Sequence, residues 1–448
     1  MTPERQTHIR WLLILWLFVL SAVAFLDRVN LSIAGTKMEE EFSISNVQLG
    51  FVLSSFLVGY ALFQTPAGWL ADRFGARRIL TAGVLWWGVF SVLTAAIPPG
   101  AGNAVLALLF IRFLLGAGEA VMYPAANQFV ARWIPTQERG VANGIIFAGV
   151  GIGAGITPPL ISYIMLHWGW RSCFLVSALV GLVAGTVWFF ASRDTPEGHP
   201  SVSPSELASI QQGIPQGGRG KTGSPELLSW QAILSSRSVL ALSASYYCFG
   251  YVAWIFFGWF FIYLAQVRGL DLKTSAPFYA TLPFLAMAIA SPAGGAICDS
   301  LSKRFGARVG RCATPVASFA LTGIFVVLGS VTKDTRIASL VLAGGAGSLY
   351  LSQSSFWAVS ADLGGKSSGS LSGFMNMAGQ VGGAVTLSLT PAIASAFGWS
   401  AGFLTAAAVA LLGGIAWLFV DPHVTLSPSF GRANRAREEE VPERREPA

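Results

Sequence analysis

Apolar runs of about twenty residues recur along the whole chain, and they constrain the fold more than any other feature of the sequence. Each is long enough to cross a hydrocarbon layer of about 30 Å as an α-helix. We count twelve of them, at residues 11–34, 48–71, 79–97, 104–130, 139–166, 171–192, 239–266, 275–298, 313–331, 337–360, 367–394 and 399–420. Only 11% of the residues are charged, whereas soluble domains carry about 25%. The sequence therefore predicts an all-α polytopic membrane protein with twelve transmembrane helices.

Basic residues indicate how these helices are oriented, because loops rich in Lys and Arg tend to stay in the cytoplasm. With the N-terminus inside, 21 Lys and Arg residues fall on inner segments, six on outer segments and two, Arg28 and Arg112, within spans. We therefore expect both termini in the cytoplasm, in a bacterial inner membrane. The net charge of +7 reflects this topology. No nucleic-acid partner is expected, since the basic residues are not gathered on one face.

Short repeats indicate that the helices form two similar halves. The segment RFGAR occurs twice, and three further pairs of short motifs recur, all at a separation of 229 to 231 residues. The pairs are 73–77 with 304–308, Gly140 and Gly144 with Gly369 and Gly373, 148–149 with 378–379, and Gly169, Trp170 and Phe174 with Gly398, Trp399 and Phe403. We expect pseudo-symmetric six-helix bundles at 1–192 and 239–420. A cytoplasmic linker at 193–238, with a short helix near 204–212, would join them, and a disordered cytoplasmic tail would occupy 421–448.

Four ionisable residues lie within the predicted spans, namely Asp27, Arg28, Arg112 and Glu119. An uncompensated charge in a bilayer costs at least about 2.5–3.5 kcal/mol, so these groups should face one another or a water-filled cavity. Arg112 and Glu119 share one face of a helix, about 10 Å apart along its axis. A carboxyl group that gains and loses an arginine neighbour can release and bind a proton, because the neighbour stabilises the charged form. The alternative is a static ion-pair network that only holds two helices together.

The segment GWLADRFGARR at 68–78 resembles the loop between helices 2 and 3 of the major facilitator superfamily. A second copy at 295–308 carries four extra residues after its acid. The resemblance implies the major facilitator fold, with both loops acting as a latch that holds the two halves in one conformation. The latch residues would be Gly68, Asp72, Arg73, Gly75, Arg77, Asp299, Arg304 and Arg308. For the second copy, simple anchoring at the inner surface is the alternative.

The segments FLDRVN at 25–30 and RFLLGAGEA at 112–120 are similar to the anion:cation symporter family, which includes proton-coupled galactonate and hexuronate carriers. The resemblance implies that Asp27 and Glu119 take up protons and that Arg112 couples them. It also implies that Arg28 binds the carboxylate of the substrate. Tyr60 and Asn376 would line the substrate cavity, and Gln380, one turn after Asn376, is an alternative to it.

The expected function is secondary active transport, in which a small organic anion such as a sugar acid enters the cell together with protons by alternating access. No motif of a hydrolase or an ATP-driven pump is present, so we expect no enzyme, no metal and no cofactor, with protons as the coupling ion and a monomer as the working unit. One alternative is an antiporter that exchanges organic phosphates for phosphate, although 239–266 contains no Lys or Arg. The other is a non-transporting membrane sensor with the same fold.

Overall fold

The computed structural model describes residues 6–100, 102–214, 227–260, 263–269, 275–423 and 426. Within these ranges the regular secondary structure is entirely helical. The long helices are α1 (Ile9–Phe42), α2 (Asn46–Phe74), α3 (Ala76–Ala95), α4 (Ala104–Glu119), α5 (Met122–Trp133), α6 (Arg139–Trp168), α7 (Trp170–Ala191), α10 (Arg237–Gly258), α12 (Ser275–Phe305), α13 (Ala307–Val331), α14 (Thr335–Leu351), α15 (Gln353–Gly364), α16 (Ser368–Phe397) and α17 (Trp399–Ala416). The short elements are α8 (Pro204–Gly213), α9 (Trp230–Ser235), η1 (Thr136–Glu138), η2 (Pro196–Gly198), η4 (Tyr263–Val267), η5 (Gly365–Ser367) and η6 (Trp417–Phe419).

In the described part of the chain, 11 helical stretches are long and apolar enough to cross a membrane. One of them, Thr335–Phe397, contains two of the predicted spans, which are separated by the turn η5. The other stretches correspond one to one to the remaining predicted spans. The structure thus confirms the predicted helical membrane fold.

Two of the predicted spans are each divided into two helices. Within 104–130, α4 ends at Glu119 and α5 begins at Met122. Within 337–360, α14 ends at Leu351 and α15 begins at Gln353. The breaks fall at corresponding places in the two halves of the chain, and they put polar side chains at helix ends inside the molecule.

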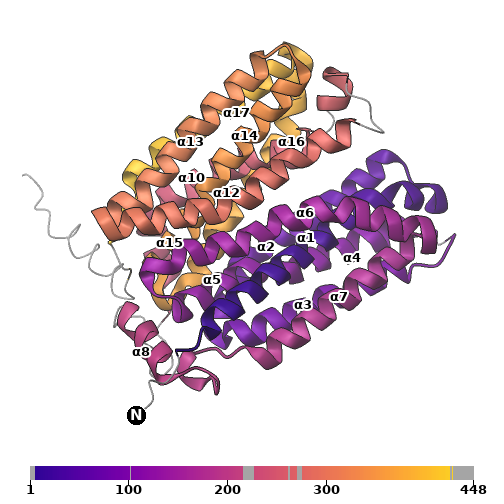
Figure 1. The fold of residues 1–448 in the computed structure, drawn as a ribbon. Helices are drawn as coiled ribbons and strands as arrows, with labels where there is room; N and C mark the ends of the chain where they lie inside the picture. The colour runs from indigo at the N-terminus through magenta and orange to yellow at the C-terminus, as the bar shows by residue number, and fades with distance from the viewer. Residues whose placement is uncertain are drawn as a thin grey trace, which may run out of the picture.

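The helices form two bundles with the same internal packing (Figure 1). In the first bundle, α1 packs against α6 and α7, α2 against α4, and α3 against α4 and α7. In the second, α10 packs against α16 and α17, α12 against α14, and α13 against α14 and α17. Every one of these neighbour pairs has a counterpart in the other bundle. The pseudo-symmetry that the sequence repeats predict is therefore present.

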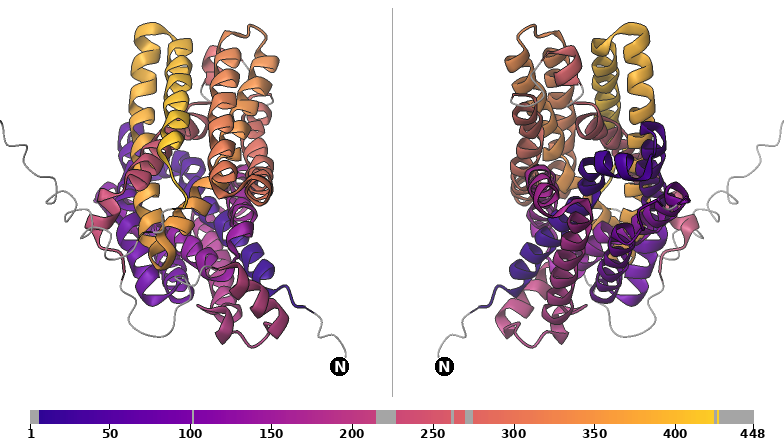
Figure 2. Two further views of the ribbon diagram at one scale, coloured as in Figure 1. Left: turned by 90° about the vertical axis from the view of Figure 1, so that its left-hand side faces the viewer. Right: turned by 90° about the vertical axis from the view of Figure 1, so that its right-hand side faces the viewer.

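The two bundles meet along two helix pairs, α6 with α12 and α2 with α16. The first pair is visible in the middle of Figure 1, and Figure 2 shows the bundles from two opposite sides. The pairs are again equivalent, since α6 corresponds to α16 and α2 to α12. We call the end of the molecule that carries Asp72 and Asp299 the latch end; the first residues of α1 lie at this end, next to η1 and α8.

The repeated glycines have a conformational reason. Gly75 and Gly306, in the two RFGAR segments, have φ angles of 90° and 87°, and each connects two consecutive helices. Gly169 and Gly398 do the same before α7 and α17, with φ angles of 79° and 85°. Residues with a side chain rarely adopt such angles, so glycine is needed at each of these sharp connections.

The segment between the bundles includes the predicted short helix, which is α8. The carboxylate of Glu206 on this helix accepts hydrogen bonds from the backbone N–H groups of Ile9 and Arg10, at 3.1 Å each. A carboxylate at a helix N-terminus stabilises it, because it pairs with free N–H groups and opposes the helix dipole. The linker thus holds the start of α1 at the latch end. The tail predicted at 421–448 lies almost entirely outside the described residues.

Candidate functional site

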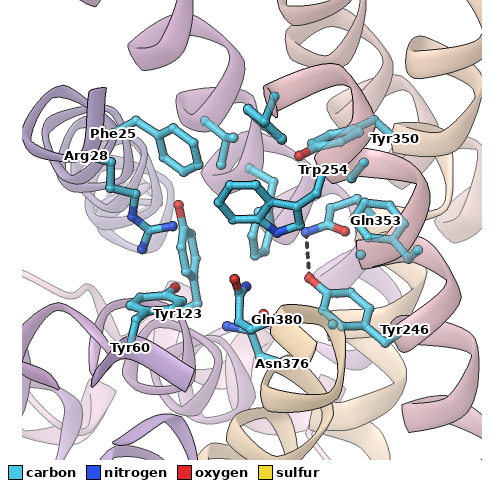
Figure 3. A pocket seen from close by; sticks show the side chains of 17 residues that line it. Phe25, Arg28, Tyr60, Tyr123, Tyr246, Trp254, Tyr350, Gln353, Asn376 and Gln380 are labelled. Atoms are coloured by element: carbon cyan, nitrogen blue, oxygen red, sulfur yellow. Dashed lines mark hydrogen bonds between the residues drawn. The ribbon is translucent and has the colours of Figure 1, made fainter. Parts of the chain in front are cut away.

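A cavity lies between the two bundles (Figure 3). It encloses about 540 Å³ of empty space, counting the part that is open to solvent. The first bundle contributes side chains from α1, α2, α5 and α6, and the second from α10, α14, α15 and α16. Its lining is Phe25, Arg28, Tyr60, Tyr123, Phe147, Val150, Tyr246, Phe249, Gly250, Ala253, Trp254, Phe257, Tyr350, Gln353, Asn376, Gly379 and Gln380.

Aromatic side chains border the cavity at both ends. On the side of the latch end, the rings of Tyr123 and Phe147 stack at 4.7 Å, and Phe147 lies 4.8 Å from Trp357 of the other bundle. On the opposite side, Phe25 and Phe257 approach each other across the bundles, with ring centroids 5.9 Å apart. The cavity is therefore closed toward the latch end by packed rings and narrowed by one aromatic pair at the other end.

Arg28 is the only Lys or Arg side chain among the lining residues. Its Nε donates to Glu119 Oε1 at 2.6 Å, and its guanidinium lies 4.1 Å from the centre of the Tyr60 ring, a cation–π distance. The side chain of Arg28 is 11% exposed, while that of Glu119 is 0% exposed. Its Nη2 has no hydrogen-bond partner among the described residues. Arg28 thus binds an acid on its buried side and faces the cavity with the rest of the guanidinium.

Asp27 and Arg112 lie deeper in the first bundle, behind Arg28. Asp27 Oδ1 accepts a hydrogen bond from Ser91 Oγ at 3.2 Å, and its Oδ2 has no partner among the described residues. The guanidinium of Arg112 lies 5.1 Å from the Phe56 ring, and its Nε and Nη1 also have no partner in the described part of the chain. Arg112 is close enough to interact electrostatically with both Asp27 and Glu119.

The structure therefore brings the four predicted charged residues together in one cluster. Arg28 alone among them lines the cavity; Asp27, Arg112 and Glu119 are at most 2% exposed and lie outside the lining. Two carboxylates and two guanidinium groups balance each other in charge, which reduces the cost of burying them. Their roles in proton coupling stay predictions.

Tyr60, Asn376 and Gln380, which the sequence places at the cavity, all line it. The Asn376 amide nitrogen donates to Gln64 Oε1 at 2.9 Å, which connects α16 with α2 across the bundles. Gln380 is in the lining together with Asn376, so the two are not alternatives to each other.

Several lining residues are not identified by sequence reasoning, among them Tyr123, Tyr350 and Gln353. Tyr123 follows Glu119 by four positions, so helical spacing would have placed both on one face. Tyr350 and Gln353 lie beside the break between α14 and α15. No local sequence pattern predicts that break. The two residues reach the cavity only because of how the bundles pack.

Asp72 joins the two bundles at the latch end. Its carboxylate accepts hydrogen bonds from Gly369 N at 2.8 Å, Ser370 N at 2.7 Å and Ser370 Oγ at 2.6 Å, at the N-terminus of α16. These N–H groups carry the positive end of the helix dipole, so an acid is favourable there. A Cβ atom on Gly68, one turn before Asp72, would lie 2.0 Å from the Gly369 carbonyl oxygen. The predicted latch residues Gly68 and Asp72 thus lie at the junction.

Asp299 makes the equivalent junction in the other direction. It accepts from Gly140 N at 3.1 Å and Val141 N at 2.7 Å, at the N-terminus of α6. It also binds Arg311 Nη1 at 2.8 Å, and Arg311 Nη2 donates to the carbonyl of Thr136. The second loop copy therefore connects the bundles in spite of its four extra residues.

A third connection at the latch end was not expected from the sequence. Arg139 Nη1 of α6 binds Asp362 Oδ1 of α15 at 2.6 Å, and Arg311 Nε lies 3.3 Å from Asp362 Oδ2. Asp362 thus interacts with two buried arginines, one from each bundle. Neither Arg139 nor Arg311 belongs to a repeated motif that would identify it in the sequence.

The remaining predicted latch residues do not connect the bundles in this conformation. Arg77 donates from its backbone N to Asp194 Oδ1 at the start of the linker and from Nε to the Phe189 carbonyl in the first bundle. Gly75 forms the turn described above. Arg73, Arg304 and Arg308 are exposed, and no hydrogen bond joins them to the other bundle among the described residues.

We expect the substitution Gly68→Ala to open the latch end. All three atoms that would clash belong to the backbone of Gly369 and Ser370, so α2 and α16 must separate by about an ångström to admit the methyl group. The distance between spin labels at positions 73 and 304, one in each bundle, should increase. Gly88→Ala is the matched control, because its Cβ would lie 4.0 Å from the nearest atom of a neighbouring helix, the Ala178 carbonyl oxygen. An unchanged distance in the Gly68 variant would contradict the prediction.

Comparison with known proteins agrees with this geometry. The Major Facilitator Superfamily profile matches residues 17–387. The protein named "Probable sulfoacetate transporter SauU" of Cupriavidus necator is 32% identical over 93% of this chain and 94% of its own length. The "Probable galactarate/D-glucarate transporter GarP" of Escherichia coli is 30% identical over 76% of this chain and 78% of its own length. The chain belongs to the Major Facilitator Superfamily, and within it to the family of these anion transporters, as the sequence motifs predict.

Among solved structures, the proton:xylose symporter XylE has the same fold, with a TM-score of 0.70. The alignment covers 94% of this chain and 98% of XylE. At 14% sequence identity it shows similarity of fold only. The protein is accordingly an integral membrane transporter and not an enzyme.

Proposed function

We propose that the protein takes up a small organic anion together with protons by alternating access. The observation that carries this proposal is the position of Arg28, which binds Glu119 on its buried side and faces the cavity between the bundles on the other. An anion that enters the cavity competes with Glu119 for the same guanidinium. Anion binding and the charge state of the buried acid are therefore coupled through one side chain.

The coupling works as follows. When the substrate carboxylate binds Arg28, Glu119 loses part of its stabilisation and becomes a better proton acceptor. Arg112 and Asp27 lie within electrostatic range, so a proton on either acid changes the charge of the whole cluster. A cluster that binds anion and proton together is nearly neutral overall. When the transporter changes from its outward-facing to its inward-facing state, burying this neutral cluster costs less free energy than burying the cluster with an anion or a proton alone.

An uptake cycle starts from a conformation that is closed toward the cytoplasm, and the conformation of this structure supports such a cycle. The latch end is closed by Asp72, Asp299 and Asp362. We assign this end to the cytoplasm, because the N-terminus, the linker and most basic residues belong to it by the charge pattern of the sequence. The cavity then faces the outside of the inner membrane, from which substrate and protons enter.

The cavity and the relatives support the proposed chemical class of the substrate. The relatives named above are described as transporters of sulfoacetate and of the sugar acids galactarate and D-glucarate. One arginine together with tyrosine, glutamine and asparagine side chains suits a small acid with hydroxyl groups. An organic-phosphate antiporter is disfavoured, since the second bundle contributes no basic residue to the lining.

The test is transport by the purified protein in proteoliposomes. A thermal-shift screen of sugar acids, dicarboxylates, sulfonates and organic phosphates selects the anion that stabilises the protein most. We expect an inward proton gradient to drive its accumulation, with alkalinisation of the external medium. Substrate accumulation that does not depend on the proton gradient would refute proton symport. Strict exchange of the substrate against phosphate would also refute it. Binding without any flux would instead indicate a sensor.

A further inference from the structure

Two hydrogen bonds between uncharged side chains join the bundles between the cavity and the latch end. Asn127 Nδ2 of α5 donates to Ser360 Oγ of α15 at 2.9 Å. Asn376 Nδ2 of α16 donates to Gln64 Oε1 of α2, also at 2.9 Å. The four residues are at most 3% exposed. We call them the amide layer.

The amide layer lies between the cavity and the charged junctions at the latch end. On α2, Gln64 follows the lining residue Tyr60 by one turn and precedes Asp72 by two turns. On α5, Asn127 follows the lining residue Tyr123 by one turn, and the helix continues toward the latch end. A molecule that leaves the cavity through the latch end therefore passes between the two sides of this layer.

The two hydrogen bonds use only part of each amide group. Asn127 Oδ1 and Gln64 Nε2 are buried and have no hydrogen-bond partner among the described residues. A Cβ atom on Gly373 would lie 2.4 Å from the Gln64 carbonyl oxygen, so α2 and α16 touch through their backbones beside Gln64. A buried polar group without a partner costs the free energy of its lost hydration. The closed latch end contains two such groups.

Separation of the bundles at the latch end changes this balance. Water then reaches both sides of the amide layer, and the two unpartnered groups gain hydrogen bonds. The two bonds between the bundles are exchanged for bonds to water, which changes the free energy little. Apolar side chains at the same positions would oppose separation, because exposing them to water costs free energy in proportion to their area. The amide layer thus lowers the free energy of opening.

We propose that the amide layer is an inner gate that favours opening, because hydration of Asn127 Oδ1 and Gln64 Nε2 offsets part of the stability of the charged junctions at the latch end. This inference rests on the proposed alternating access, but it requires neither proton coupling nor a particular anion. The contrary role is a clasp, in which the two bonds between the bundles hold them together. The two roles predict effects of opposite sign when the layer is made apolar.

The backbone N–H groups of Gly369 and Ser370 report the opening of the latch end. Both lie in the first turn of α16, where N–H groups have no partner within the helix, and both donate to Asp72 of the other bundle. Their exchange with deuterium requires that the bundles separate, and its rate follows the fraction of open molecules even when that fraction is small. Hydrogen exchange of the purified protein, read by mass spectrometry of a peptide that covers 369–370, needs no substrate.

The substitution Asn127→Val tests the sign of the effect. Valine removes the unpartnered oxygen and makes this part of the layer apolar. Ser360 Oγ still donates to the Trp357 carbonyl at 2.9 Å, so no buried donor is left without an acceptor. We expect exchange at Gly369 and Ser370 to slow about tenfold, since opening no longer satisfies a buried acceptor. Faster exchange would show a clasp and overturn the inference, and an unchanged rate would overturn it as well.

Gln64→Met repeats the test at the other hydrogen bond and keeps the inference testable if Asn127→Val does not fold. It removes the unpartnered Nε2, and Asn376 lines the cavity, where its amide can bind water instead. Exchange should again slow. Thr94→Val is the control, because this buried hydroxyl donates to the Phe90 carbonyl of its own helix at 2.8 Å, and α3 packs on helices of its own bundle. It should leave the exchange rate unchanged. Absence of proton-driven uptake would refute the proposed function and leave this inference standing.

Discussion

Replacement of Arg28 by alanine is expected to reduce the affinity for the transported anion about 100-fold and to abolish uptake. A hydrogen bond to a charged group contributes about 1.5–3 kcal/mol, and each 1.4 kcal/mol corresponds to a factor of ten. Arg28 supplies the only Lys or Arg side chain in the lining, so no neighbour can replace it. Isothermal titration of the purified variant with the anion selected by thermal shift measures the loss.

Two further variants separate the anion-binding role of Arg28 from a structural one. Arg28→Lys keeps the charge but not the forked geometry, and it should retain part of the affinity. Arg336→Ala removes an exposed arginine at the start of α14 and should change neither binding nor uptake. A dissociation constant in Arg28→Ala equal to that of the unmodified protein would exclude Arg28 from the substrate site.

Substitution of Glu119 by glutamine should separate transport from proton coupling. Glutamine has the size of a protonated glutamate, and its amide oxygen can still accept the hydrogen bond that Arg28 Nε donates at 2.6 Å. The variant should exchange anion across the membrane of preloaded vesicles at a rate within about threefold of normal. Accumulation driven by a proton gradient should be lost, because the side chain can no longer bind and release a proton. The comparison of exchange with accumulation in the same vesicles is the decisive measurement.

Glu41→Gln provides the matched control for this variant. Glu41 is also a glutamate on an arginine, with its Oε1 2.7 Å from Arg171 Nη2, but it lies near the far end of α1, away from the cavity. The hydrogen bond from Arg171 keeps the pKa of Glu41 below its ordinary value, so this acid stays ionised at neutral pH. Its replacement should leave gradient-driven accumulation intact. Normal accumulation in Glu119→Gln as well would remove Glu119 from the proton path.

The charge cluster shows how far sequence reasoning reaches. Asp27, Arg28, Arg112 and Glu119 can be identified as a group because each is expensive to leave alone in a membrane. The sequence does not reveal the pairing within the group. The ion pair of Arg28 with Glu119 and the partner-free Nε and Nη1 of Arg112 depend on the angle at which α1 and α4 pack. Helical spacing positions residues along one helix only.

At the latch end, too, the sequence predicts the local turns but not the contacts between the bundles. The two RFGAR segments point to the turns at Gly75 and Gly306, since their backbone angles suit glycine alone. Asp72 and Asp299 each meet the start of a helix from the other bundle, some 297 and 159 positions away in the chain. The Asp362 connection carries no sequence signature at all.

By itself, the sequence determined that this protein crosses a membrane repeatedly, that its two halves are alike, and which four charged residues lie in the middle of its first bundle. Hydrophobic length, glycine conformation and the cost of buried charge are local properties, and they can be read from short segments. Only the tertiary structure decided that Arg28 lies between the cavity and Glu119, and that Tyr246 and Gln353 line the opposite wall, with Trp357 bonded to Tyr246. Those contacts join helices that are distant in sequence, and the packing of the two bundles sets them.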